Sequence, residues 1–270
     1  MRVLFLLGVL FLFRGCDCIA GYHCIDEACL RKTLLTAYDN HVRPVKKASS
    51  HVPVWITITP IKIRELDEKN HNIELDTWLT VKWHDEYLKW DPNDHHGINN
   101  LVLPVSDIWR PDITLYTGTP DSSVIPSMTT NSVIRSNGDI IWVPPYTIKS
   151  RCPVSQKHRR RVRSPGASPY TSRERRMESI QYRSSTDRHE ERHSDELICS
   201  IAIGSWTLSE NLVDLKPLSD KVDMSNFDDG HHDWTLDTVT SRRVSKYYDC
   251  CEEPYAHINF TLTFRRHDHH

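Results

Sequence analysis

The feature that most constrains the fold is an alternation of side chains with a period of two. Val54, Ile56 and Ile58 alternate with Trp55, Thr57 and Thr59, and the same period of two runs through residues 73–81. Successive side chains of a strand point to opposite faces, so this period predicts strands with one buried face. Further strand candidates are residues 132–135, 140–143, 198–203, 235–240 and 257–264.

One helical pattern precedes these strands. Residues 28–40 bring Leu30, Leu34, Leu35 and Tyr38 close to one face of a helix. Turn signals at residues 67–70, 91–94, 137–139 and 144–145 separate the strand candidates. Many short strands after a single helix favour an all-β fold, an antiparallel β-sandwich.

The N-terminus predicts a signal peptide at residues 1–20. Arg2 precedes an unbroken apolar run of eleven residues, and Cys18-Ile19-Ala20 supplies small residues at a cleavage site. The run is shorter than the roughly 20 residues that a membrane helix needs. A buried N-terminal helix is the alternative. We therefore expect a secreted, extracellular chain with no membrane span, in an oxidising compartment.

Six cysteines remain after this cleavage, and an even number predicts disulfides, with fifteen possible pairings. Cys250 and Cys251 are adjacent, so their Cα atoms lie about 3.8 Å apart. The usual span is about 4.4–6.8 Å, so a bridge there is strained and serves as more than a staple. Cys24 and Cys29 would lie about 8.6 Å apart on one helix, so a bridge between them requires a helix that begins near or after Cys29.

Residues 153–198 depart from the rest of the chain. They are rich in Arg, Ser, Glu and His and almost free of apolar residues, so they cannot form a core and we expect a disordered, solvated insert. A basic tract at residues 159–163 raises the alternative of nucleic-acid binding. Seven acidic residues between Glu174 and Glu196 dilute that charge, and the chain carries a net charge of only −2, so no nucleic-acid partner is expected.

Aromatic residues gather in turn-like contexts. The faces of Trp and Tyr rings attract quaternary ammonium groups, and a cage of such rings is a common solution for choline-like cations. Taken singly, each ring is more often part of a core. The residues concerned are Trp78, Trp109, Tyr116, Trp142, Trp206, Tyr247, Tyr248 and Tyr255.

Four motifs give these aromatics a common pattern. Residues 109–116 read WRPDITLY, 204–207 read GSWT, 248–255 read YDCCEEPY, and 78–83 with 88–92 read WLTVKW and LKWDP. They resemble, respectively, loops A, B, C and D of the extracellular ligand-binding domain of the nicotinic acetylcholine receptor (Cys-loop) family, and they follow one another along the chain as in that family. The resemblance covers residues 29–266 and is broken only by the insert.

The resemblance implies an immunoglobulin-like antiparallel β-sandwich with an N-terminal helix, assembled into a ring pentamer with a ligand site at each subunit junction. Asp112 is expected to brace loop B, and loop F falls around residues 223–234 without assigned contacts. One chain carries both walls of the site, so a homopentamer is expected, with a hetero-oligomer of receptor subunits as the alternative. The implied principal wall is Tyr116, Trp206, Tyr248, Tyr255 and the Cys250–Cys251 bridge, and the complementary wall is Trp78, Val133, Ile141 and Val143.

The resemblance also implies that Cys152 pairs with Cys199 and Cys250 with Cys251. Cys152 and Cys199 enclose 46 residues, many more than the family's loop, and the motif by which that loop touches the channel is absent. The chain ends where receptors enter their first membrane helix. These departures predict a domain at 21–266 with a tail at 267–270, similar to the soluble acetylcholine-binding proteins and binding acetylcholine or a related cation.

The main alternative is the truncated extracellular domain of an α-type receptor subunit, in which the insert is retained intron sequence. Leu208 stands where many α-type subunits have Tyr, a difference expected to alter ligand preference. Asn259-Phe260-Thr261 is an N-x-S/T sequon on the solvent face of its strand, and predicts N-glycosylation of Asn259.

The sixteen histidines suggest a more distant alternative, a metal-binding protein or metal enzyme. They occur as adjacent pairs, His95-His96, His231-His232 and His269-His270, and not at the i,i+4 spacing of helical zinc ligands. No nucleophile–base motif or Gly-rich phosphate loop accompanies them. The sequence therefore predicts no enzyme activity, no metal site and no cofactor.

Overall fold

A computed structural model describes residues 26–119, 130–152, 155–156 and 196–267. The predicted signal peptide at residues 1–20, Cys24, most of the predicted insert and the last three residues of the predicted tail lie outside these ranges. No helix within the described ranges is long and apolar enough to cross a bilayer.

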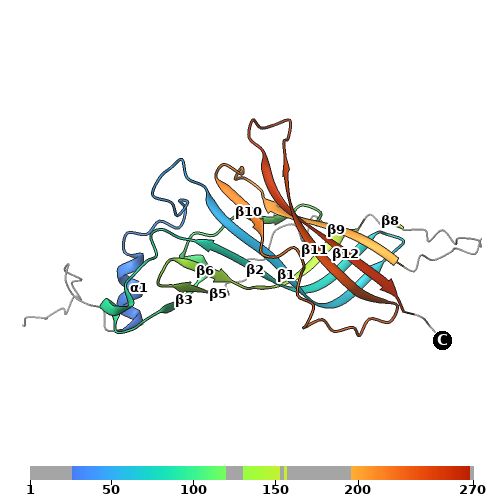
Figure 1. The fold of residues 1–270 in the computed structure, drawn as a ribbon, viewed down its shortest axis with the longest axis horizontal. Helices are drawn as coiled ribbons and strands as arrows, with labels where there is room; N and C mark the ends of the chain where they lie inside the picture. Colours follow the sequence, from blue (N-terminus) through green and yellow to red (C-terminus); the bar gives the residue numbers. More distant parts are fainter. Residues whose placement is uncertain (1–25, 120–129, 153–154, 157–195, 268–270) are drawn as a thin grey trace, which may run out of the picture.

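The helix α1 (Glu27–Leu35) lies at one end of the elongated domain (Figure 1). The Asp26 side chain caps it by accepting a hydrogen bond from the backbone N–H of Cys29 at 2.7 Å. Leu30 is buried and Tyr38 packs against the core, as expected. The helix is shorter than the predicted range of 28–40, because beyond Leu35 tertiary contacts replace helical ones, above all a hydrogen bond from Tyr38 to Asp85.

Seven strands form the first sheet. Its order is β10-β1-β2-β6-β5-β3, and β7 also pairs with β2. All neighbours are antiparallel except β1 and β10, which run parallel. The strands are β1 (Val52–Asp67), β2 (Asn72–His84), β3 (Asn100–Pro104), β5 (Asn131–Arg135), β6 (Asp139–Trp142), β7 (Pro145–Arg151) and β10 (Val213–Pro217).

Five strands form the second sheet, in the order β11-β12-β9-β4, with β8 paired to β9. All of its pairs are antiparallel. The strands are β4 (Ile113–Leu115), β8 (Ser155–Gln156), β9 (Glu196–Ser205), β11 (Trp234–Lys246) and β12 (Tyr255–Arg266). Two short 3-10 helices, η1 (Pro92–His95) and η2 (Val105–Asp107), lie outside the sheets.

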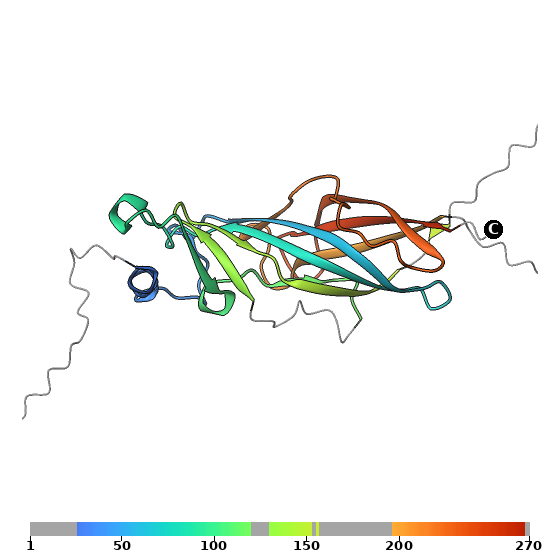
Figure 2. The same cartoon turned by 90° about the horizontal axis from the view of Figure 1, so that it is seen from below.

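The two sheets pack face to face around a single core (Figure 2). Residues alternate between buried and partly exposed along β1, β2, β9 and β12, which is the pattern that the sequence predicted for strands with one buried face. The predicted all-β sandwich with one N-terminal helix is therefore confirmed. The largest fully buried side chains include Trp83, Trp142, Trp234, Phe260 and Phe264.

The sequence missed several strands. Pro144-Pro145 was interpreted as a turn, yet β7 begins at Pro145; proline is tolerated as the first residue of a strand because it needs to donate no ladder hydrogen bond there. The short strands β3, β4, β8 and β10, of two to five residues each, were also missed.

The predicted C-terminal boundary of the insert, residue 198, was wrong. Residues 196–198 belong to β9, and Leu197 is fully buried. Ser155–Gln156 also pairs with β9, as β8. The few apolar residues in this stretch are enough to continue the sheet, because a strand needs only alternate positions inside the sandwich. The remaining residues of the prediction lie outside the described ranges.

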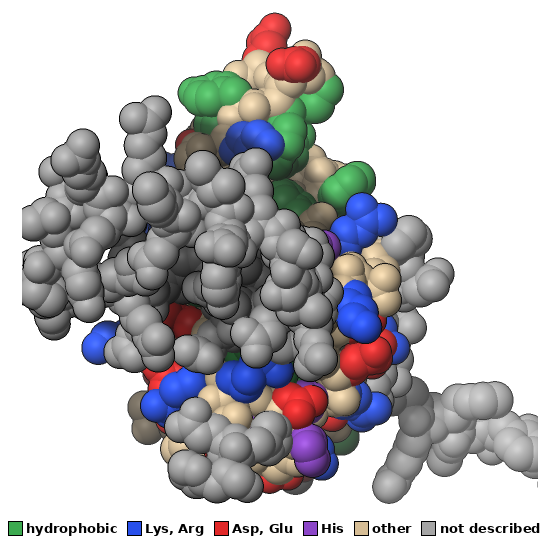
Figure 3. Space-filling view, turned by 90° about the vertical axis from the view of Figure 1, so that its right-hand side faces the viewer, with side chains coloured by type: hydrophobic (Ala, Val, Ile, Leu, Met, Phe, Trp, Pro, Cys, Tyr) green, Lys and Arg blue, Asp and Glu red, His purple; other side chains and the backbone are tan. Residues whose placement is uncertain are grey.

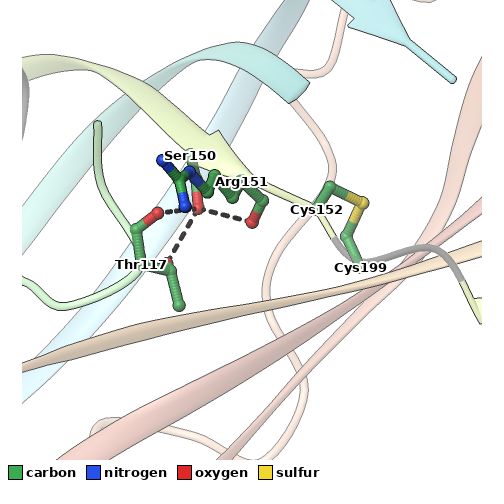
Figure 4. Close-up of a disulfide and its surroundings, with 5 residues drawn as sticks. All are labelled: Thr117, Ser150, Arg151, Cys152 and Cys199. Atoms are coloured by element: carbon green, nitrogen blue, oxygen red, sulfur yellow. Dashed lines mark hydrogen bonds between the residues drawn. A yellow bond between two sulfur atoms is a disulfide. The ribbon is translucent and has the colours of Figure 1, made fainter. Parts of the chain in front are cut away.

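Two disulfides join described residues. Cys152, just after β7, is bonded to Cys199 in β9, with their Cα atoms 5.0 Å apart, so the bridge links the two sheets (Figure 4). Beside it, the Ser150 hydroxyl lies within 2.8 Å of the Thr117 hydroxyl. Cys250 is bonded to Cys251 in the turn between β11 and β12. Cys29 is also in a disulfide. Cys24, whose pairing with Cys29 the sequence left open, lies outside the described residues.

Candidate ligand-binding site

Loop A, residues 109–116, runs from the buried Trp109 to Tyr116, beside the end of β9. Trp109 is buried and packs edge-on against Trp83, with ring centroids 6.4 Å apart. The strand β4 follows this anchor, and Tyr116 comes directly after β4. The Tyr116 hydroxyl donates a hydrogen bond to the carbonyl of Ser205. The Tyr116 ring crosses β9 at Gly204, where an added Cβ would lie 2.6 Å from the ring. Gly204 is therefore required for Tyr116 to lie where it does.

Asp112 connects loop A to the turn that follows β9. Its carboxylate accepts hydrogen bonds from the Ser205 hydroxyl, from the Thr207 N–H at 2.6 Å and from the Thr207 hydroxyl at 2.5 Å. Its own carbonyl accepts the N–H of Trp206 at 3.3 Å. Hydrogen bonds to a carboxylate are the stronger kind, so these contacts tie loop A to the Gly204–Thr207 turn. That Asp112 braces loop B for binding stays a prediction.

Trp206 stands on this turn with its ring in solvent. Its side chain is 68% exposed, which is unusual for the largest apolar side chain. The rings of Tyr116 and Trp206 meet edge to face with centroids 6.1 Å apart. Asp112 thus fastens the backbone from which this exposed ring projects beside the ring of Tyr116.

The hairpin of β11 and β12 supplies two further rings. Tyr248 and Tyr255 also meet edge to face, with centroids 6.0 Å apart. The hairpin projects beyond the rest of the domain (Figure 1), and hydrophobic side chains gather along it below an acidic tip (Figure 3). The Cys250–Cys251 bridge lies at this tip, between the two tyrosines in sequence.

The Tyr116–Trp206 pair and the Tyr248–Tyr255 pair are close enough for the tyrosines of the second pair to affect the Tyr116 hydroxyl. Burial raises the pKa of the Tyr116 hydroxyl well above its ordinary value, and the neighbouring Tyr248, Asp112 and Tyr255 raise it further. The hydroxyl is therefore neutral at pH 7 and remains a hydrogen-bond donor to Ser205. Loops A, B and C thus place four aromatic rings on the outward face of the second sheet.

Two cationic or titratable residues of this wall were missed by the sequence reasoning. The ammonium of Lys246 lies 4.8 Å from the ring centroid of Tyr248, and the His257 ring lies 5.6 Å from that of Tyr116. Lys246 is the cross-strand partner of Tyr255, and His257 follows Tyr255 by two positions in β12. That spacing places Tyr255 and His257 on the same face of a strand, a signal that the sequence did contain.

The predicted complementary residues lie on the first sheet. Val133 and Ile141 are directly opposite each other in the β5–β6 ladder, while Trp78 is 44% exposed in β2 and Val143 is exposed just after β6. Val102, opposite Val133 in β3, extends this apolar surface and was not predicted.

A single chain does not bring the two walls together. The Tyr116, Trp206, Tyr248 and Tyr255 rings belong to the second sheet and its loops, whereas the Trp78 wall is on the outward face of the first sheet. Inward-facing side chains of both sheets fill the core between them. A ligand that touches both walls must therefore lie between two copies of the domain or between two different chains.

Among the described residues, no group of three or more His, Cys, Asp or Glu side chains is placed to hold a metal ion. His95 and His96 belong to η1 and its C-terminal cap, and His231 accepts hydrogen bonds from the N–H groups of Asp233 and Trp234. The pair His269-His270 lies outside the described residues.

Comparison with curated proteins gives receptor subunits. A neuronal acetylcholine receptor subunit alpha-6 of Rattus norvegicus is 28% identical over 263 residues, covering 97% of this chain and 45% of the subunit. A neuronal acetylcholine receptor subunit alpha-9-II of Oncorhynchus mykiss is 30% identical over 233 residues, 86% of this chain and 36% of the subunit. An acetylcholine receptor subunit alpha-type acr-16 of Caenorhabditis elegans is 30% identical over 242 residues, 90% and 42% respectively.

The chain spans less than half the length of these relatives. The model of one family matches it over residues 27–158 and 194–268, on both sides of the segment that the sequence had set apart as an insert. This is a family of receptor domains and not of enzymes, in agreement with the expectation from the sequence. The fold, the order of the four motifs and these matches show that the chain belongs to the neurotransmitter-gated ion-channel ligand binding domain family.

Proposed function

We propose that this domain binds a small cationic amine, acetylcholine or a close relative, in an aromatic cage between two subunits. The observation that carries the proposal is the placement of four rings on one outward face, with Trp206 largely exposed and held by Asp112. An exposed cluster of this kind has little to gain in an isolated domain, whereas ring faces attract a quaternary ammonium that has no hydrogen bonds to satisfy.

The magnitudes are adequate for a specific site. A single cation–π contact contributes about 0.5 kcal/mol when exposed and about 2 kcal/mol or more when desolvated. Micromolar binding corresponds to about 8 kcal/mol. Four rings of the principal wall and Trp78 of the opposite wall can supply most of this once the neighbouring subunit excludes water.

The separation of the two walls supports assembly. The complementary wall, with Trp78, Val133, Ile141 and Val143, faces away from the cage of the same chain. Because one chain carries both walls, copies arranged head to tail in a closed ring would each complete the site of a neighbour. We propose a homopentamer, the number implied by the resemblance to the nicotinic receptor family, secreted and bearing a glycan at Asn259.

A second candidate has the same binding chemistry in a different protein. The relatives named above are subunits of acetylcholine receptors, and the second candidate is the ligand-binding part of an α-type channel subunit. A transcript that continues into apolar, membrane-spanning segments, or one that joins Cys152 to Cys199 through a short loop, would support it over a secreted binding protein.

The test is calorimetric binding of carbamoylcholine to the secreted protein, together with its mass by size-exclusion chromatography and light scattering. Trp206→Ala should weaken binding at least tenfold and leave the oligomer intact. Tyr87→Ala is the matched control, because Tyr87 is an exposed aromatic outside both walls and its loss should leave the affinity within about twofold. Unchanged affinity in a folded Trp206→Ala protein would refute the cage.

A further inference from the structure

His257 lies inside the wall of the proposed site. Its Cα is directly opposite Gly204 on one side and Val244 on the other. A Cβ added at Gly204 would lie 2.9 Å from the Cβ of His257 and 2.6 Å from the Tyr116 ring. The Tyr116 ring and the Cβ of His257 therefore share the space that Gly204 leaves open. The imidazole lies beside Tyr116, with the ring centroids 5.6 Å apart, and so lines the proposed cage.

The surroundings of this imidazole disfavour a positive charge. Its Nδ1 is buried and has no hydrogen-bond partner within the described part of the chain. The charged groups that act on it come from β11, Lys246 and Arg242, and both are cations. Loop A contributes Tyr116, which is neutral, and β9 presents Gly204, which has no side chain. Burial first, and then these two cations, lower the pKa of His257 below its ordinary range.

We infer that His257 makes the affinity of the site for a cation dependent on pH, so that acidification weakens binding. The inference rests on the proposed function. At neutral pH the imidazole is uncharged and tolerates a bound ammonium beside the Tyr116 ring. Once protonated it is a like charge within the same wall, and like charges repel strongly where water is excluded. Linkage requires the reverse effect as well: a bound cation makes His257 harder to protonate.

The direction follows from the two protonation states. The ordinary pKa of histidine is about 6.5, and that of His257 is lower. Affinity should therefore be constant from pH 8 to pH 7 and fall below about pH 6.5. Because a single proton is involved, the fall approaches but does not exceed about tenfold for each pH unit.

The experiment measures carbamoylcholine binding by calorimetry at pH 8.0 and at pH 5.0 on the full oligomer. Carbamoylcholine is a quaternary ammonium and does not titrate in this range. The wild-type ratio of the two dissociation constants should exceed that of His257→Gln several-fold. His231→Gln is the matched control, since the pKa of His231 is also lowered, mainly by burial, but its side chain caps the start of β11, at the other end of that strand from the cage. It should keep the wild-type pH dependence.

A second readout needs no variant. Titrations near pH 6 in two buffers of different ionisation enthalpy should show that the wild type releases protons when carbamoylcholine binds. Equal pH ratios for wild type and His257→Gln, or no proton release at any pH between 5 and 7, would overturn the inference while leaving the proposed function standing. No binding of carbamoylcholine to the wild type at pH 8.0 would overturn both.

Discussion

The phenol of Tyr38 connects three parts of the domain, and its removal is a sharp test of how loop A is held. Its hydroxyl donates a hydrogen bond of 2.7 Å to the Asp85 carboxylate and accepts one of 2.9 Å from the N–H of Trp109. Asp85 has no exposed surface and also accepts the N–H groups of Tyr87 and Leu88. Tyr38→Phe keeps the ring and deletes only the oxygen that satisfies both partners.

The cost can be worked from these contacts. A hydrogen bond to a charged group contributes about 1.5–3 kcal/mol, and a buried N–H left without an acceptor costs about 1–3 kcal/mol. The sum is reduced because Asp85 keeps two backbone donors and because the ring of the variant carries no hydroxyl that folding must desolvate. We expect the free energy of unfolding to fall by about 3 kcal/mol, which lowers the Tm of a domain of this size by about 6–12 °C.

The loss should also depend on pH. Burial raises the pKa of Asp85, and the hydrogen bond from Tyr38 counteracts part of that rise. A carboxyl whose folded pKa is raised contributes most to stability when it is protonated, below its unfolded pKa of about 3.9, and this contribution is lost as the pH rises through the folded pKa. Without the Tyr38 hydroxyl the folded pKa rises further, so the difference between variant and wild type should be larger at pH 8 than at pH 4.5.

Urea unfolding followed by tryptophan fluorescence at both pH values measures this difference. Tyr87→Phe is the matched control, because the Tyr87 hydroxyl is exposed and donates to a single carbonyl, that of Val45; it should change stability by less than about 1 kcal/mol. A loss below about 1 kcal/mol in Tyr38→Phe, or one that does not change with pH, would refute the assigned role of the Tyr38–Asp85 pair.

Two further predictions concern the ligand wall, both measured by carbamoylcholine calorimetry. Asp112→Asn should weaken binding by about tenfold or more, since a neutral amide cannot accept all the bonds from Ser205 and Thr207; Asp237→Asn, whose partner is an exposed Arg265, should bind normally, and equal affinities in both variants would contradict the brace. Lys246→Met should strengthen binding about two- to fivefold, because its ammonium no longer competes for the Tyr248 ring; weaker binding would mean that Lys246 helps the ligand.

Features that depend on residues close together in the sequence could be predicted from it. Alternation placed Val54, Ile56 and Ile58 inside the sandwich, and all three are fully buried. The motif around Asp112 led to the expectation that it braces loop B, and the structure contains the hydrogen bonds that this requires. Whether the predicted rings bind a ligand stays a prediction. The β7 strand was missed because the meaning of Pro145 depends on whether a neighbouring strand needs its N–H.

The register between strands could not be predicted from the sequence, and it determines which residues lie side by side in the candidate site. Gly204 and His257 are 53 positions apart in sequence and become neighbours only because β9 pairs with β12 in one register. A slip of one residue would turn His257 into the core. A second register, that of β4 on β9, sets Tyr116 over Gly204 and brings Asp112 to the Trp206 turn. Loops A and B are thereby joined to each other within the domain. Under the proposed function, pre-formed contacts of this kind lower the entropic cost of binding, and the ordering that remains falls mainly on the projecting β11–β12 hairpin and on the proposed neighbouring subunit.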